Sequence, residues 1–115
     1  WKFIASVKEC IEKNMGDSDL NVEMLSNLHY MSRTSFFNKL KALTGLAPAD
    51  YIRLIRLQHA AQLLKQGEYT ITESADKVGF SDAKYFREVF KKYYGVSPSK
   101  YVEAEKIHSQ SSEQD

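Results

Sequence analysis

Apolar side chains recur at intervals of three and four residues along most of the chain, which is the spacing of helices with one buried face. Phe3, Val7 and Ile11 form the first such stripe, with Ile4 and Cys10 beside it. The later stripes are Val22, Leu25 and Leu28; Phe36, Leu40 and Leu43; Tyr51, Ile52, Ile55, Ala60, Leu63 and Leu64; Ile71, Ala75 and Val78; and Phe86, Phe90 and Tyr93. No segment alternates as a strand would. We therefore predict an all-α fold of about seven helices.

The residues between the stripes are those that begin and end helices. Asn21 and Ser32 are predicted N-caps, Thr70 and Glu73 form a capping-box pattern, and either Ser81 or Asp82 caps the helix that follows. Glycines at 45 and 95 end helices, and prolines at 48 and 98 occupy first helical positions. The helix from Pro48 to Gly67 is the longest predicted element, at about 28 Å.

One pattern occurs twice. Phe36-x-x-x-Leu40-Lys41-x-Leu43-x-Gly45 with Pro48-x-x-Tyr51 returns fifty residues later, as Phe86-x-x-x-Phe90-Lys91-x-Tyr93-x-Gly95 with Pro98-x-x-Tyr101. We expect two helical units, residues 1–46 and 68–108, joined by a linker helix over 47–67, with a disordered tail over 109–115. Two positions break the repeat. Tyr30 stands where the second copy has Gly79, which predicts a differently shaped first turn, and Ser74 replaces an apolar residue, which thins the second core.

The overall charge of +1 conceals two basic regions at matching places in the repeat. Residues 33–56 carry a net +4 and residues 84–100 again +4, whereas 1–23, 68–82 and 103–115 are acidic at −2, −3 and −3. This distribution favours a polyanionic partner. A pair of solvated, lysine-rich helix faces would have the same composition.

Other function classes lack the residues they need. Cys10 is the single cysteine, and the three histidines are far apart, so no metal or other cofactor is expected. There is no Gly-rich phosphate loop and no catalytic grouping, so we predict that the chain is not an enzyme. No apolar run could span a membrane, and no signal peptide opens the chain. Trp1 in place of Met indicates a piece of a longer protein.

Each copy is a short helix, a turn of about three residues and a longer basic helix, which is the plan of a helix-turn-helix. Removing the apolar stripe from the longer helix leaves an outward face. That face is Arg33, Thr34, Phe37, Asn38 and Lys41 in the first copy, and Ala83, Lys84, Arg87, Glu88 and Lys91 in the second. Amide, guanidinium, carboxylate and methyl groups are the side chains that contact base edges in the major groove.

These residues resemble the DNA-binding domain of AraC/XylS-type bacterial transcription regulators, over about Val22 to Val102. The most specific matches are Ile71-x-Glu73-x-Ala75-x-x-Val78-Gly79-Phe80-Ser81, Tyr85-Phe86-x-x-x-Phe90-Lys91-Lys92-Tyr93-x-Gly95-x-x-Pro98-x-x-Tyr101, and a linker-like Pro48-x-x-Tyr51-Ile52-x-x-x-Arg56-Leu57. The N-terminal helix is similar to those of AraC-type domains that end hybrid two-component sensor regulators.

The resemblance implies two recognition helices in successive major grooves of an operator. It implies base contacts by Thr34, Phe37, Asn38, Ala83, Lys84, Arg87 and Glu88, and phosphate contacts by Ser32, Arg33, Lys41, Ser81, Tyr85, Lys91 and Lys92. The expected partners are duplex DNA, the rest of a longer chain with sensor or receiver domains, and RNA polymerase as a further candidate. The expected location is the cytoplasm, even where the whole protein is anchored in a membrane.

Several alternatives stay open from the residues alone. Phe37 either faces the groove or packs under a neighbouring helix, and Arg56 either bridges the two halves or contacts phosphate. The first helix is either a lid on the first core or a dimer surface. The aromatic residues 85, 86, 90, 93 and 94 are either core or a base-stacking platform. The rival function is a helical protein-interaction module or a non-specific nucleic-acid binder.

Overall fold

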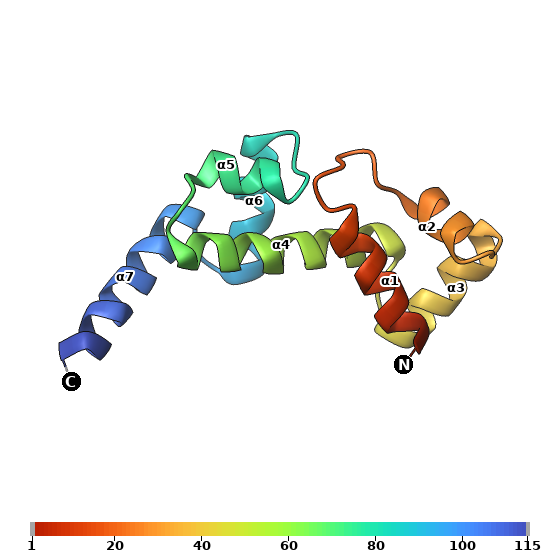
Figure 1. Ribbon diagram of the computed structural model, residues 1–115, viewed down its shortest axis with the longest axis horizontal. Coiled ribbons are helices and arrows are strands. Elements are labelled where there is room, and N and C mark those ends of the chain that lie inside the picture. The colour runs from red at the N-terminus through yellow and green to blue at the C-terminus, as the bar shows by residue number, and fades with distance from the viewer. Residues whose placement is uncertain (1, 115) are drawn as a thin grey trace. The chain divides into compact units, whose positions relative to one another are not determined.

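The computed structural model describes the backbone of residues 2–114 and the side chains of residues 2–107, and in this part of the chain it contains seven helices and no strand. The all-α prediction is confirmed. The helices are α1 (Lys2–Lys13), α2 (Val22–Leu28), α3 (Arg33–Thr44), α4 (Pro48–Gln66), α5 (Ile71–Lys77), α6 (Ala83–Tyr94) and α7 (Pro98–Gln114) (Figure 1). α7 extends over residues 109–114 of the predicted tail, but the side chains there lie outside the described residues, so the disorder of the tail stays a prediction.

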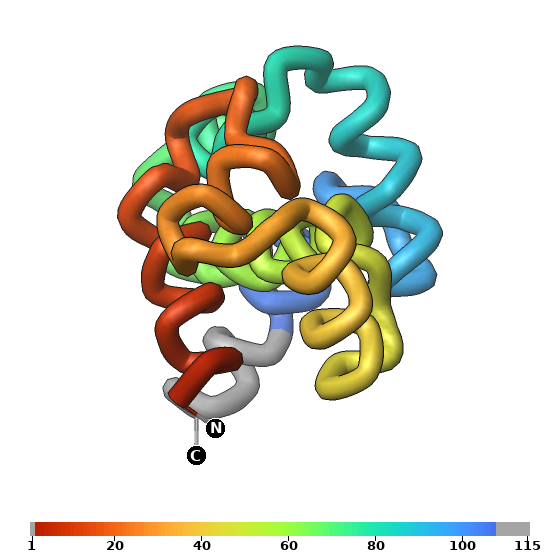
Figure 2. Tube along the Cα trace, turned by 90° about the vertical axis from the view of Figure 1, so that its right-hand side faces the viewer, coloured from red at the N-terminus to blue at the C-terminus, as the bar shows by residue number. Residues whose placement is uncertain are grey.

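The chain divides into two compact units, residues 1–58 and 59–115, and the division lies inside α4. Unit 1 holds α1, α2, α3 and the first part of α4. Unit 2 holds the remainder of α4 with α5, α6 and α7. In unit 1 the chain passes from α2 into α3 through a short turn, and α5 passes into α6 in the same way (Figures 1 and 2).

The predicted caps begin and end the helices where expected. The side chains of Asn21 and Ser32 accept hydrogen bonds from the backbone N–H groups of Met24 and Ser35, at 3.0 and 3.1 Å. Thr70 and Glu73 form the reciprocal capping box, and these hydrogen bonds from Thr70 hold the pKa of the Glu73 carboxyl below its ordinary value. Between the two candidates for α6, the N-cap is Asp82.

Each unit has its own apolar core around the longer helix of the repeat. Phe36 and Leu40 are fully buried in α3, as are Phe86 and Phe90 in α6. The remaining buried apolar side chains come from α1, from the loop after it, and from α2, α4, α5 and the turn after α5: Val7, Ile11, Met15, Leu20, Leu25, Tyr51, Ile52, Ile55, Leu57, Ala60, Ala61, Leu64, Ala75, Val78 and Phe80. The aromatic packing of unit 2 extends to Tyr94, where burial raises the pKa of the phenol to about 12.

Three predicted core positions are wrong. Leu28, Leu43 and Tyr93 are 53%, 54% and 50% exposed. Leu43 and Tyr93 occupy the same place in the repeat, and in both units the buried row continues instead to the half-buried residue that follows, Thr44 or Tyr94. The buried face of the longer helix therefore follows steps of four residues, along one i±4 ridge.

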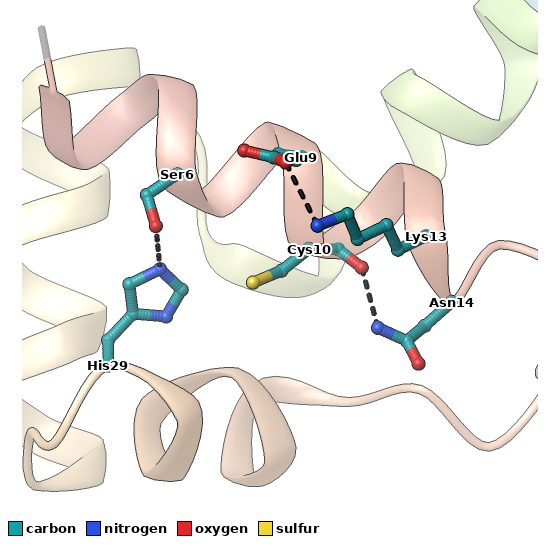
Figure 3. Close-up of polar contacts among 6 residues, drawn as sticks. All are labelled: Ser6, Glu9, Cys10, Lys13, Asn14 and His29. Carbon is teal, nitrogen blue, oxygen red and sulfur yellow. Dashed lines mark hydrogen bonds and ion pairs between the residues drawn. The ribbon is translucent and has the colours of Figure 1, made fainter.

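The first helix, α1, covers the core of unit 1. This position favours the interpretation of α1 as a lid on that core, in place of a dimer surface. The Phe3 ring lies edge-on to both the His29 and Phe36 rings, with centroid distances of 5.8 and 5.7 Å. The Ser6 hydroxyl lies 3.0 Å from His29 Nε2 (Figure 3). His29 Nδ1 lies 2.7 Å from the Leu25 carbonyl oxygen; since that oxygen can only accept, Nδ1 carries a proton.

Arg56 has a structural position. It is buried, and its Nη2 donates a 2.6 Å hydrogen bond to the carbonyl oxygen of Asp17, in the loop after α1. Burial lowers the pKa of the guanidinium, and the charge of Asp17 opposes that shift. Both partners belong to unit 1, so this hydrogen bond ties the loop to α4 within one unit, and burial argues against the phosphate alternative for Arg56.

Replacing Ser74 by alanine is expected to raise the free energy of unfolding by about 1 kcal/mol. Ser74 is fully buried, and among the described residues its hydroxyl has no hydrogen-bond partner. The hydroxyl therefore loses its hydration on folding without gaining a hydrogen bond, and alanine removes this unfavourable contribution. Ser26 is the matched control. It is equally buried, but its hydroxyl donates a 2.9 Å hydrogen bond to the Glu23 carbonyl oxygen. Urea denaturation measures both variants. A Ser74→Ala variant less stable than wild type would show that the hydroxyl has an ordered partner such as water.

Candidate nucleic-acid interface

The two helix pairs α2–α3 and α5–α6 are joined by turns with the same hydrogen bonds. The N–H of Met31 donates to the Ser26 carbonyl oxygen at 3.0 Å, and that of Phe80 donates to the Ala75 oxygen at 2.9 Å. The expectation of a differently shaped first turn is therefore wrong. Tyr30 takes the left-handed conformation of its glycine counterpart, with a φ of +55° against +94° for Gly79. The packing of α2 on α3 determines the turn, and the tyrosine conforms to it.

The predicted contact residues of unit 1 lie together on α3. Thr34, Asn38 and Lys41 are exposed along the helix, and Ser32 and Arg33 are exposed at its start. Phe37 is half-buried, and the Lys41 ammonium lies over its ring, 5.9 Å from the centroid. Half-burial is compatible with both alternatives for Phe37, so its groove contact stays a prediction.

The predicted contact residues of unit 2 repeat this arrangement on α6. Lys84, Arg87, Glu88, Lys91 and Lys92 are exposed, Ser81 is exposed just before the helix, and Ala83 is half-buried in its first turn. Tyr85 is 43% exposed, and its ring centroid lies 6.2 Å from that of Phe80. This contact holds the ring against the core, while part of the side chain stays accessible.

The aromatic cluster of unit 2 divides between core and surface. Phe86 and Phe90 are buried, and Tyr94 packs between Phe90 and Tyr101 with centroid distances of 4.5 and 5.4 Å. Tyr93 and Tyr85 are the exposed members. Core packing thus accounts for the centre of the cluster, and within the described part of the chain the exposed rings of this cluster form no continuous row for stacking bases.

The charges on the two faces are available to an anion. Residues 24–49 contain no aspartate or glutamate, and α6 contains only Glu88. Within the described part of the chain, Arg33 and Arg87 form no ion pair. An exposed, unneutralised row of cations on a helix is the electrostatic footprint that phosphate contacts require.

The described residues show neither a metal site nor a membrane-spanning helix. Among the described residues, no group of three or more His, Cys, Asp or Glu side chains is placed to bind a metal ion. None of the helices described is long and apolar enough to cross a bilayer. Tyr30 is a highly exposed side chain beside the predicted face to which the sequence assigned no contact. Its signal was the break in the repeat at Gly79.

Comparison with known proteins places these features in a family. A family model described as a helix-turn-helix domain matches residues 25–104. The chain is 40% identical over 91 residues to histidine kinase P4 of Formosa agariphila, covering 79% of this chain and 7% of that protein. It is 38% identical over 84 residues to an HTH-type transcriptional regulator of Haemophilus influenzae, covering 73% of this chain and 28% of the other. It therefore spans only a small part of these relatives.

Solved structures share this fold over most of the chain. The DNA-binding domain of the transcriptional factor AdpA, determined with a target DNA, superposes with a TM-score of 0.83 at 30% identity, covering 90% of this chain and 93% of that one. The C-terminal domain of AraT, a response regulator from Geobacillus stearothermophilus, gives a TM-score of 0.81 at 30% identity, covering 89% and 84%. With the family model spanning most of the chain and both helix-turn-helix units present, the chain belongs to the AraC-type helix-turn-helix family.

Proposed function

We propose that this chain binds double-stranded DNA sequence-specifically and thereby regulates bacterial transcription, with α3 and α6 entering successive major grooves. The observation that carries the proposal is the repetition of one helix face: positions 34, 38 and 41 of α3 and the equivalent positions 84, 88 and 91 of α6 are all exposed and carry polar or charged side chains. A non-specific binder needs only the cations. It does not need Thr34 and Asn38 on one helix and Arg87 beside Glu88 on the other.

The comparisons support the same function. AdpA is a transcriptional factor whose matching domain was crystallised with its target DNA, and the Haemophilus relative is a transcriptional regulator.

The length of α4 fits the same function. Its 19 residues form a helix about 28 Å long, which is comparable with the ~34 Å between successive major-groove faces. Binding, with no catalysed reaction, is the activity we propose.

The residue roles follow from position and chemistry. We assign base contacts to side chains of the two recognition faces that can contact base edges, and phosphate contacts to cations and hydroxyls on or beside those faces. The base set is Thr34, Phe37, Asn38, Ala83, Lys84, Arg87 and Glu88, and the phosphate set is Ser32, Arg33, Lys41, Ser81, Tyr85, Lys91 and Lys92.

The remainder of the protein supplies the signal in this proposal. One relative is a histidine kinase of which the match covers 7%, and two structural neighbours are C-terminal domains of response regulators. We infer that the domain is the output end of a two-component regulator, acting in the cytoplasm with RNA polymerase as the downstream partner.

Selection of bound duplexes from a random pool, at about 150 mM salt, tests the function directly. We expect an enriched motif with two half-sites about one helical turn apart. Enrichment of a single half-site would show that only one unit contacts bases. A folded chain that enriches no sequence contradicts the proposal and favours a protein-interaction module.

Replacing Lys91 by alanine is expected to weaken binding to every duplex and to lower the slope of log K against log salt by about one. The reason is that an exposed ammonium at a phosphate releases one counterion and carries no sequence information. Affinities measured at three or more salt concentrations check this. Lys65, outside both recognition faces, is the control. An unchanged slope in Lys91→Ala would contradict the phosphate role.

A further inference from the structure

Tyr30 combines a positive φ with an almost fully exposed side chain, which is uncommon for a bulky residue. It is the single residue other than glycine with a positive φ among those the structure describes, and its side chain is 98% exposed. The equivalent turn of unit 2 is built with Gly79. The Gly79 N–H donates a hydrogen bond to the Asp76 carbonyl oxygen at 3.0 Å, and in the same way the Tyr30 N–H donates to the Asn27 carbonyl oxygen at 3.1 Å. A glycine at position 30 would therefore complete the same turn.

The left-handed conformation of Tyr30 costs free energy, and no contact among the described residues offsets that cost. A residue with a Cβ is disfavoured in the left-handed region, and a bulky one most of all. Within the described part of the chain, the Tyr30 side chain makes no hydrogen bond or ring contact, and it buries almost nothing. Strain that folding does not use is characteristic of residues that contact a partner.

The surroundings of Tyr30 indicate an anionic partner. It lies near the start of the 26-residue stretch 24–49, which contains no carboxylate and carries Arg33, Lys39 and Lys41. It is two residues before Ser32, the N-cap of α3, and both Ser32 and Arg33 are exposed. In a helix-turn-helix the start of the second helix meets the bases, and the first helix crosses the backbone. The turn between them thus lies at the edge of the groove.

We propose that the Tyr30 phenol donates a hydrogen bond to a DNA backbone phosphate at the edge of the groove that α3 enters. This inference rests on the proposed function and adds a positioning contact to it. Tyrosine is one of the side chains that hydrogen-bond phosphate oxygens in protein–DNA complexes. The contact is neutral and sequence-independent, so it strengthens binding on every duplex and leaves the salt dependence unchanged.

The test compares Tyr30→Gly and Tyr30→Phe with wild type, using a random-sequence duplex of about 30 bp at about 50 mM salt and the duplex enriched by selection. Tyr30→Gly relieves the backbone, and we expect its Tm to rise by roughly 2–6 °C. Both variants are expected to bind both duplexes about three- to tenfold more weakly, with an unchanged salt slope. A more stable protein that binds more weakly identifies the tyrosine as a binding residue.

Each other result overturns the inference. Wild-type affinity in Tyr30→Gly would remove Tyr30 from the DNA interface and leave a protein partner as the reason for its exposure, while the proposed function would stand. Wild-type affinity in Tyr30→Phe would exclude the phenol as donor. A loss confined to the selected duplex would indicate a base contact in place of a phosphate contact. If the folded wild-type chain binds neither duplex, the proposed function fails together with the inference.

Discussion

Replacing Phe36 by alanine is expected to destabilise unit 1 by about 3–5 kcal/mol. The ring is fully buried at the centre of the unit, and it contacts Phe3 from α1 and His29, at centroid distances of 5.7 Å each. Alanine removes the burial of the ring and leaves a cavity between three elements. A domain of this size has a total stability of only about 5–15 kcal/mol, so the loss is a large fraction of it.

Urea denaturation followed by far-UV circular dichroism measures this loss. Phe37→Ala is the matched control, since it deletes the neighbouring ring of the same helix, which is only half-buried. We expect it to cost less than half as much as Phe36→Ala. Equal losses for both variants would contradict the assignment of the buried face of α3. Because unit 2 has its own core, a first unfolding step that leaves about half of the helical signal would show that the units unfold separately.

Replacing Arg87 or Asn38 by alanine is expected to cost about 1–3 kcal/mol on the selected duplex, which is a five- to 150-fold loss of affinity. A guanidinium contacts two acceptors of guanine and an amide contacts adenine, so each loss should relax preference at one base pair. Both side chains are exposed, and the Tm of each variant should stay that of wild type. Selection repeated with each variant locates the base pair.

The two variants also discriminate between the units. Arg87 lies in unit 2 and Asn38 in unit 1, so their relaxed base pairs should fall in different half-sites. An equal loss on all duplexes would contradict base contact by that residue and move it to the phosphate set. The Lys91→Ala variant supplies the reference behaviour for a phosphate contact.

Much of the local structure could be predicted from the chain because it depends on neighbours in sequence. Asn21, Ser32 and Thr70 cap helices whose first N–H groups lie within three residues of them. Gly45 ends α3 with a φ of +78°, and Pro48 begins α4 as its first residue. The repeat identified both helix-turn-helix units, since the same residues recur at the same spacing.

The candidate site could be located from sequence to the face of a helix, and only partly to the side chain. Subtracting the apolar stripe left Thr34, Asn38 and Arg87 outside, and the structure exposes all three. The last position of the stripe was assigned one residue too early, at Leu43 and Tyr93 in place of Thr44 and Tyr94. Two residues seven positions apart lie near the same face of a helix. Which edge of that face is buried depends on where the neighbouring helices pack, and that is decided only in the tertiary structure.

What the sequence by itself determined is the set of helices, their ends and the twofold repeat, because these follow from periodicity and local hydrogen bonds. Only the tertiary structure decided the features that depend on distant residues. It brought Ser6 to His29 and Arg56 to Asp17, and it held Tyr30 in a left-handed turn. Packing of α2 on α3 imposes that conformation, because the favourable burial of a whole helix face outweighs the roughly 1–2 kcal/mol that one strained residue costs.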